Sequence, residues 1–187
     1  YGQPPQEIYQ EVTLLKSVDF GQNSLVGAWK IWKALGKIDA DIYFAETASP
    51  GIPLISLFCK MKKKYFIYRT ASERECNGEY IRKNPLLAGL YKWSLRNTSK
   101  VITQTKTDID HLHKTTRVRS IAIPNGHWLG IPNQKPRNTI LWVGRSDRIK
   151  RPDLFVKLAQ ELPNYPFTMI CQKATYDAGY EELLSQT

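Results

Sequence analysis

Short apolar runs alternate with longer amphipathic segments along the sequence, and few folds are compatible with that order. The runs have the length and the β-branched and aromatic content of strands, and the segments between them show helical periodicity. Strands that alternate with helices predict a parallel α/β sheet with right-handed crossovers. The expected strands cover residues 12–16, 41–46, 65–69, 101–104, 118–123, 140–143 and 167–171.

Capping residues, prolines and glycines mark the ends of the expected helices. Pro85 lies inside a helical pattern at 79–97 and predicts a kink or break there. An expected helix at 49–64 opens on Ser49-Pro50, which suits a capping serine followed by a proline in the first turn. The other expected helices cover residues 23–36, 108–115, 152–162 and 177–184, with caps at Asn23 or Ser24 and at Thr107.

Composition and charge limit the function classes. The 187 residues carry 27 Lys and Arg against 17 Asp and Glu, a net charge of +10. Such a charge suits polyanions, anionic membrane surfaces or phosphate-bearing substrates. Three scattered cysteines argue against a disulfide framework or a zinc site, and Cys59 and Cys171 are expected to be buried thiols. The longest apolar stretch, 51–59, is too short for a bilayer span of about 20 residues, so the chain is expected to be cytoplasmic.

Residues 139–153 form the strongest candidate site. Residues 140–143 are expected to be a buried parallel strand, which Gly144 ends with a turn. Pro152 and Asp153 suit the first turn of the helix that follows. Ligands of parallel α/β sheets lie beyond the carboxyl ends of strands, so the segment predicts an anion site, with a solvated basic loop as the alternative. Its cations are Arg145, Arg148, Lys150 and Arg151.

Two motifs in a fixed order carry a family resemblance. Ile123-Pro-Asn-Gly126 is followed, after a variable loop, by Ile140-Leu-Trp-Val-Gly-Arg145 and then by Lys150 ahead of a helix. This order resembles the family 4 glycosyltransferases. The upstream segments that look like parts of that family's acceptor-binding domain are residues 41–46, 49–50, 68–72 and 101–105.

The resemblance implies a retaining enzyme of the GT-B fold, in which two Rossmann-like domains face each other across a cleft. The implied fold class is α/β, with Rossmann-like parallel sheets that are incomplete at both ends. Residues 1–124 would be the latter part of the acceptor-binding domain, 125–138 the interdomain linker, and 139–187 the first part of the nucleotide-sugar-binding domain. The family's early glycine-rich loop and late Glu-x7-Glu segment have no counterpart here. The isolated chain is therefore expected to transfer no sugar, with residues 139–187 packed against residues 1–124 or partly mobile.

The resemblance also implies a reaction and its site. The donor would be a nucleotide diphosphate sugar, and the acceptor a saccharide or a lipid-linked molecule of polysaccharide or glycolipid biosynthesis. Gly144, Arg145 and Lys150 would bind the donor diphosphate. These fixed cations would stabilise the leaving group, so neither a cofactor nor a metal is expected. No catalytic residue is identified; Arg69, which replaces the family's common histidine, and Glu73 are candidates because they follow a strand's carboxyl end.

Two Asp-x-Asp triplets raise the alternative of a metal-dependent GT-A sugar transferase. Asp39-Ala-Asp41 begins a strand, at the end of the sheet opposite the ligand side. Asp108 and Asp110 fall in a helix's first turn, where acids suit the helix dipole and residues two apart face different ways. His111 and His113 are also two apart and are expected at the surface. None of these pairs predicts a metal site.

Two other side-chain patterns have structural interpretations. Glu73, Glu75 and Glu79 resemble paired carboxylates for acid–base catalysis, but the nearby Arg74 and Arg82 favour solvated ion pairs. The Trp29–Trp32 stripe has helical spacing and is expected to be core.

An anionic membrane surface is a further expected partner. Cations flank the apolar residues of segment 82–96, and a second cationic cluster lies at 60–64. Basic residues beside anionic lipid and an amphipathic helix in the interface predict peripheral binding at the inner face of a membrane. The alternative is a buried helix with solvated cations. The residues involved are Lys60, Lys62, Lys63, Lys64, Arg82, Lys83, Lys92 and Arg96, around Leu86, Leu87, Leu90 and Trp93.

A second function class, a non-enzymatic basic α/β module that binds nucleic acid, also agrees with the charge. The sequence shows no recognisable RNA- or DNA-binding motif, and its cations do not alternate with aromatic residues on one strand pair. No nucleic-acid partner is therefore expected.

Overall fold

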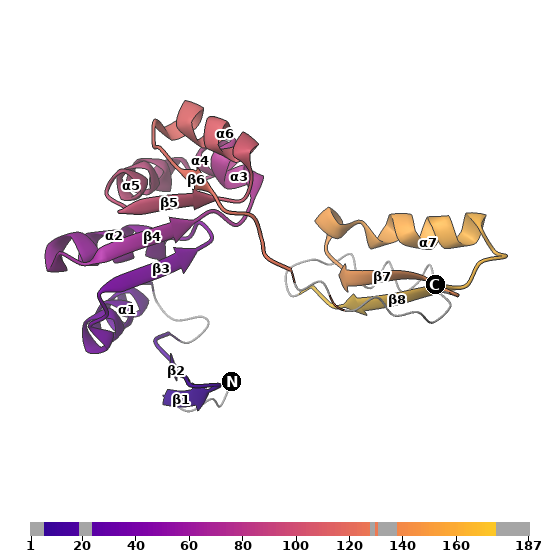
Figure 1. Cartoon of the computed structure of the whole chain (residues 1–187), viewed down its shortest axis with the longest axis horizontal. Coiled ribbons are helices and arrows are strands. Elements are labelled where there is room, and N and C mark those ends of the chain that lie inside the picture. The colour runs from indigo at the N-terminus through magenta and orange to yellow at the C-terminus, as the bar shows by residue number, and fades with distance from the viewer. Residues whose placement is uncertain (1–5, 19–23, 128–129, 131–137, 175–187) are drawn as a thin grey trace. The chain divides into compact units, whose positions relative to one another are not determined.

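The computed structural model describes residues 6–18, 24–127, 130 and 138–174 (Figure 1). The chain divides into two compact units, Tyr1–Trp128 and Leu129–Thr187. The first unit holds a parallel sheet with helices and an N-terminal hairpin. The second holds a parallel strand pair and a helix. Each unit is of the α/β type that the sequence predicts.

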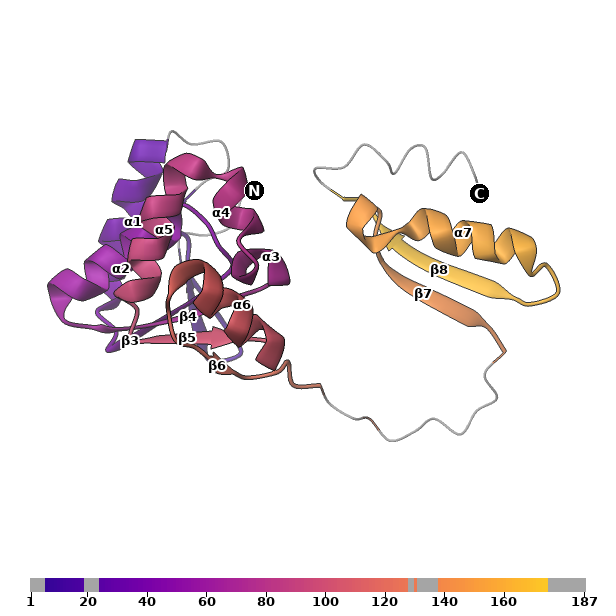
Figure 2. The same cartoon turned by 90° about the horizontal axis from the view of Figure 1, so that it is seen from above.

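The sheet of the first unit is built from four strands, β3 (Ile42–Glu46), β4 (Tyr65–Arg69), β5 (Lys100–Thr103) and β6 (Ile121–Ala122). All pairs are parallel, and the order β3-β4-β5-β6 follows the sequence. Right-handed crossovers that all advance in one direction place their helices on one face of the sheet, as Figure 2 shows. The connecting helices are α2 (Gly51–Lys62), α5 (Pro85–Arg96) and α6 (Lys106–Thr116).

The side chains of these strands alternate between a buried and an exposed face. Tyr43, Phe66, Tyr68 and Val101 are buried beneath the helices, whereas Phe44 is 58% exposed. A parallel sheet packed on its crossover helices is a Rossmann-like arrangement, so the predicted fold class is confirmed. The helical part of the core consists of Ile52, Phe58, Cys59, Cys76, Tyr91, Leu95 and Leu112.

Helix α1 (Ser24–Ile38) packs beside α2 through aromatic side chains. The ring of Trp32 meets that of Phe58 edge to face, with 5.1 Å between centroids. Trp29 is instead 57% exposed, and the Nζ atom of Lys33 lies 4.0 Å from its ring centroid. The core prediction is therefore wrong for Trp29, because residues three apart on a helix differ by about 60° in direction.

Two prolines mark helix starts. Pro50 is the N-cap residue of α2, which begins at Gly51 without a side-chain cap, so the expected capping by Ser49 is wrong. Pro85 is the first residue of α5, and the predicted break is confirmed, since α4 (Glu79–Lys83) ends just before it. A short helix, α3 (Glu73–Cys76), precedes α4.

The cap of α6 is Thr105 and not Thr107, as the sequence led us to expect. The Thr105 side chain accepts a hydrogen bond from the Asp108 backbone N–H, and the Asp108 carboxylate accepts one from the Thr105 N–H, each of 3.2 Å. This capping box fixes the helix start two residues earlier than predicted.

The expected strand at 12–16 belongs to a hairpin and not to the parallel sheet. Strands β1 (Gln6–Tyr9) and β2 (Val12–Leu15) pair antiparallel. Gln10 and Glu11 between them both have positive φ angles, of 46° and 66°, as a two-residue type I′ turn requires.

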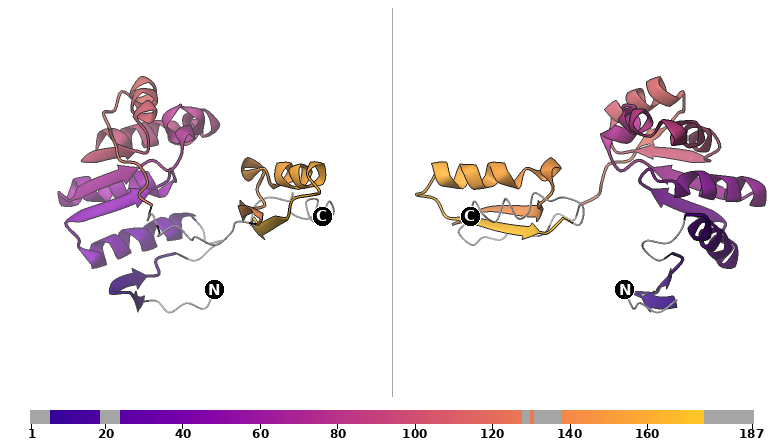
Figure 3. Two further views of the ribbon diagram at one scale, coloured as in Figure 1. Left: turned by 45° about the vertical axis from the view of Figure 1, so that its right-hand side comes forward. Right: turned by 180° about the vertical axis from the view of Figure 1, so that it is seen from behind.

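The second unit pairs β7 (Ile140–Arg145) with β8 (Phe167–Gln172) in parallel, beside α7 (Pro152–Glu161) (Figure 3). Phe155 of α7 contacts Trp142 and Phe167, with ring centroids 6.3 and 5.4 Å apart. Leu141 and Val143 are 55% and 63% exposed, and neither Ile140 nor Trp142 is fully buried, so the prediction of a buried strand at 140–143 is wrong. The expected helix at 177–184 lies outside the described residues.

Candidate functional site

The strand of the candidate anion site does not end at Gly144. Strand β7 continues through Gly144 and Arg145, and both are paired with β8. A Cβ atom on Gly144 would lie 2.9 Å from the indole of Trp142. Glycine is therefore required to make room for Trp142, and not to turn the chain as predicted.

Arg145 stands at the carboxyl end of β7 with an acidic partner. Its Nη2 atom lies 2.9 Å from the Oδ2 atom of Asp147, and its side chain is 61% exposed. The loop that follows β7 begins at Ser146, which is buried and anchors it. The Ser146 N–H donates to the Gln172 carbonyl, and its Oγ accepts from the Ala174 N–H, each at 2.9 Å. An exposed guanidinium is thus held on a rigid base.

The remaining cations of this loop differ in their partners. Lys150 is exposed, at the end of a short 3-10 turn, Arg148–Lys150, directly ahead of α7. Arg151 donates two hydrogen bonds to the Asp153 carboxylate, of 3.0 and 2.8 Å. The bond from Arg151 holds the pKa of Asp153 below its ordinary value. Arg151 is therefore engaged within the chain, whereas convergence of Arg145 and Lys150 on a diphosphate stays a prediction.

A second polar cluster lies at the carboxyl edge of the four-stranded sheet. Arg69, the last residue of β4, donates from Nη1 to the Glu46 carboxylate at the end of β3, at 2.7 Å. Its Nη2 donates to the side-chain oxygen of Asn125, which follows β6. Arg69 therefore joins three segments of this edge. A guanidinium stays charged at neutral pH, so it can orient or neutralise a ligand but cannot act as a general base.

Glu73, the second catalytic candidate, points to a different partner. It opens α3 with 66% of its side chain exposed, and its Oε1 atom lies 3.8 Å from Nδ1 of His111 on α6. The His111 side chain is only 34% exposed, so the expectation of a surface residue is wrong in part: α3 covers that side of α6.

Glu75 was not foreseen as a buried group. It is 4% exposed and accepts a hydrogen bond of 2.5 Å from the Tyr68 hydroxyl, which also lies 3.3 Å from the Tyr91 hydroxyl. Burial raises the pKa of Glu75. The predicted ion pair is wrong for this residue but is confirmed for Glu79, whose Oε1 atom lies 3.6 Å from Nε of Arg74 and 2.7 Å from Nζ of Lys83.

Three aspartates of the acidic triplets interact with other groups of the chain. Asp39 and Asp41 lie 3.2 and 3.5 Å from Nζ of Lys64, and Asp108 caps α6. Within the described ranges, no group of three or more His, Cys, Asp or Glu side chains could hold a metal ion. The same part of the chain contains no helix that is long and apolar enough to cross a membrane.

The fold and the loop after β7 define a Rossmann-like α/β protein with a candidate anion site. No protein-family model and no curated protein matches this chain. Among solved structures it is similar to a Listeria monocytogenes protein assigned as a UDP-N-acetylglucosamine 2-epimerase, with a TM-score of 0.55 and 12% identity. The match covers 91% of this chain and 51% of that protein, so the chain spans about half its length.

At 12% identity the likeness is one of fold alone. This likeness supports a GT-B-like α/β fold, as the sequence predicts. It does not distinguish the family 4 glycosyltransferases from other proteins of that fold.

Proposed function

We propose that the chain is part of a retaining glycosyltransferase of the family 4 type. It would take a nucleotide diphosphate sugar as donor and a saccharide or lipid-linked acceptor, in polysaccharide or glycolipid biosynthesis. The observation that carries the proposal is the exposed guanidinium of Arg145 at the carboxyl end of β7, just ahead of α7. Cations and helix N-termini at this position of a parallel sheet suit a diphosphate.

The chemistry of transfer explains why such groups would be needed. Departure of a nucleoside diphosphate leaves extra negative charge on its oxygens, and fixed donors that face this charge lower the barrier. One nitrogen of the Arg145 guanidinium, Nη2, lies beside Asp147. A guanidinium has five N–H donors, so the remaining donors could make a bidentate contact with the diphosphate. Lys150 would add a mobile point charge from the next turn.

The proposal gives Arg69 a role on the acceptor side. Glu46 and Asn125 hold its guanidinium plane at the ligand edge of the sheet, so it could orient acceptor oxygens or a donor phosphate. Glu73, which faces His111 instead, has the weaker case for contact with substrate.

Calorimetric titration of the chain with UDP, GDP and ADP tests the donor site. Arg145→Ala should weaken binding of the preferred diphosphate by roughly 30-fold, the scale of a lost charge-assisted contact of about 2 kcal/mol. Lys157→Ala removes an exposed positive charge from α7 in the same unit and should leave affinity within about 2-fold.

Two results would contradict the proposal. Equal losses in Arg145→Ala and Lys157→Ala would reduce the site to general charge attraction. Binding of duplex DNA or single-stranded RNA with no response to any nucleoside diphosphate would favour a nucleic-acid-binding module instead.

A further inference from the structure

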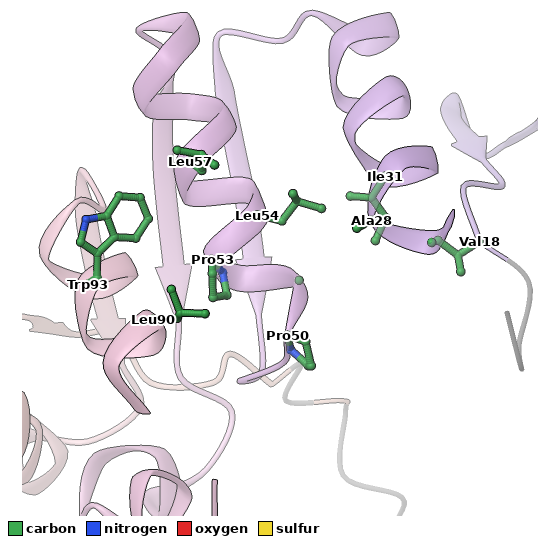
Figure 4. A pocket seen from close by; sticks show the side chains of 11 residues that line it. Val18, Ala28, Ile31, Pro50, Pro53, Leu54, Leu57, Leu90 and Trp93 are labelled. Atoms are coloured by element: carbon green, nitrogen blue, oxygen red, sulfur yellow. The ribbon is translucent and has the colours of Figure 1, made fainter. Parts of the chain in front are cut away.

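An apolar groove runs along the helical layer of the first unit. Its cavity measures about 680 Å³. Figure 4 shows α1 and α5 on either side of α2, with the strands behind α2, so the groove lies on the helical side of the sheet. The side chains that line it include Ala28, Ile31, Leu54, Leu57, Leu90 and Trp93.

Apolar side chains extend this groove onto the open surface. On α5, Leu86 is 93% exposed and Leu90 52% exposed. On α2, Leu57 is 41% exposed, and Met61, one helical turn further on, is 63% exposed. Exposed apolar side chains beside an apolar groove indicate a binding partner.

The charges on the same three helices have a single sign. Helices α1, α2 and α5 carry seven basic residues and no Asp or Glu, although the chain has 17 acidic residues elsewhere. The Nζ atom of Lys60 lies 5.5 Å from the ring centroid of Trp93, at the groove wall. The seven residues are Lys30, Lys33, Lys37, Lys60, Lys62, Lys92 and Arg96.

This surface differs from the cationic clusters visible in the sequence. Lys64 lies beside Asp39 and Asp41, and Lys83 beside Glu79, so acidic partners offset the charge of these two residues. The basic residues of α1 were absent from the sequence-based clusters. The packing of α1 beside α2 adds them to the helical layer that contains the groove.

We infer that the face formed by α1, α2 and α5 binds the surface of an anionic phospholipid bilayer. The basic residues would meet the headgroups while Met61, Leu86 and the groove receive acyl chains. A second copy of the chain on this face would oppose like charges, and a nucleic acid would leave the apolar strip in water. The inference does not rest on the donor site in the second unit.

Vesicle co-sedimentation of the chain tests the inference. Vesicles of phosphatidylcholine with 30 mol% phosphatidylglycerol, a fraction within about the usual anionic range, should bind the chain at low salt, and pure phosphatidylcholine should bind it far less. The triple variant Lys33→Gln, Lys37→Gln, Lys62→Gln should lower the partition coefficient by roughly 100-fold. The matched control Lys106→Gln, Lys114→Gln, Lys157→Gln removes the same charge from exposed positions on α6 and α7, and should lower it by less than about 10-fold.

A second variant separates insertion from simple charge attraction. Met61→Gln with Leu86→Asn changes two exposed side chains, keeps the net charge, and should weaken vesicle binding roughly 10-fold. Three results would overturn the inference: no binding to anionic vesicles, equal losses in both triple variants, or full binding by the Met61/Leu86 variant. Sedimentation velocity that shows a dimer lost in the Met61/Leu86 variant, without vesicle binding, would assign the face to a second copy.

Discussion

The Tyr68 hydroxyl donates a 2.5 Å hydrogen bond to the Glu75 carboxylate, which is buried near the carboxyl edge of the parallel sheet. The Ala71 N–H donates two longer bonds, of 3.4 Å, to the same carboxylate. Burial raises the pKa of Glu75, and the bond from Tyr68 opposes that shift only in part. Burial also raises the pKa of Tyr68 and of Tyr91, so both hydroxyls stay protonated as donors.

Glu75 should make stability fall as the pH rises. Its pKa is raised above the ordinary 4.5, so the folded chain binds this proton more tightly than the unfolded chain. The contribution of Glu75 to the free energy of unfolding is fully present below pH 4.5 and is lost as the pH rises through the folded-state pKa. Glu75→Gln should remove that decline from urea midpoints measured between pH 4 and 8.

Glu79→Gln is the control, because Glu79 should change stability with pH in the opposite direction to Glu75. The hydrogen bond from Lys83 lowers the pKa of Glu79, so its contribution is present above pH 4.5 and is lost as the pH falls. A Glu75→Gln variant whose pH profile keeps the slope of the parent chain would show that Glu75 titrates normally.

Thr105→Ala should destabilise the chain by about 1 kcal/mol, because it removes the hydroxyl that accepts a hydrogen bond from the Asp108 N–H in the α6 capping box. Thr107→Ala changes the cap that the sequence suggested and should alter the unfolding free energy by less than about 0.5 kcal/mol. Urea unfolding measures both. Equal losses of unfolding free energy in the two variants would mean that α6 begins later than the structure places it.

Gly144→Ala should destabilise the second unit by about 1–3 kcal/mol. The new Cβ atom would force the Trp142 indole away from Phe155. Gly89→Ala is the control, because nothing lies within 4 Å of its added Cβ, and a helical alanine should stabilise by about 0.5–1 kcal/mol. Hydrogen exchange at β7, β8 and α5 localises both changes. Unchanged protection of β7 in Gly144→Ala would contradict the contact with Trp142.

Cys171 should react with a thiol reagent before the other two cysteines. Burial raises the pKa of Cys59 and of Cys76 to about 11, so both are almost wholly protonated at pH 8. Cys171 is only partly buried, which corrects its expected burial. Ellman's reagent at pH 8 should label one thiol per folded chain, and Cys171→Ser should abolish that phase. A rapid phase that persists in this variant would contradict the burial of Cys59 or Cys76.

The sequence predicted the fold well because strand and helix periodicity are local properties. Phe66 and Tyr68 occupy alternate positions of β4 on the buried face, but Phe44 of β3 on the opposite face is equally apolar, so the strand sequences alone do not predict which face is buried. The sequence alone also could not identify the capping residue of α6. Thr105 and Thr107 each have an aspartate three residues on, so both fit the capping pattern, and only the burial of Asp108 distinguishes them.

The candidate site shows the same limit. The order of Gly144, Arg145 and Lys150 is visible in the sequence, and the pairing of Arg145 with Asp147 could have been predicted from their spacing. The burial of Glu75 depends on Tyr68 and on Tyr91, which is 16 residues away. No local sequence pattern indicates such a contact. The neighbouring Arg74 led us to expect a solvent-exposed ion pair for Glu75 instead.

Arg69 and Glu46 should show a favourable coupling of about 1 kcal/mol in a double-mutant cycle of Arg69→Met and Glu46→Gln. The Arg69 side chain is 17% exposed and is also held by Asn125, so little side-chain entropy remains to oppose the pair. The exposed pair of Lys83 and Glu79 should couple more weakly, since it is a neighbouring pair on one helix. Urea unfolding measures both cycles. A Lys83–Glu79 coupling as large as that of Arg69–Glu46 would mean that the edge of the sheet gains nothing from the bridge that Arg69 makes between β3, β4 and the segment after β6.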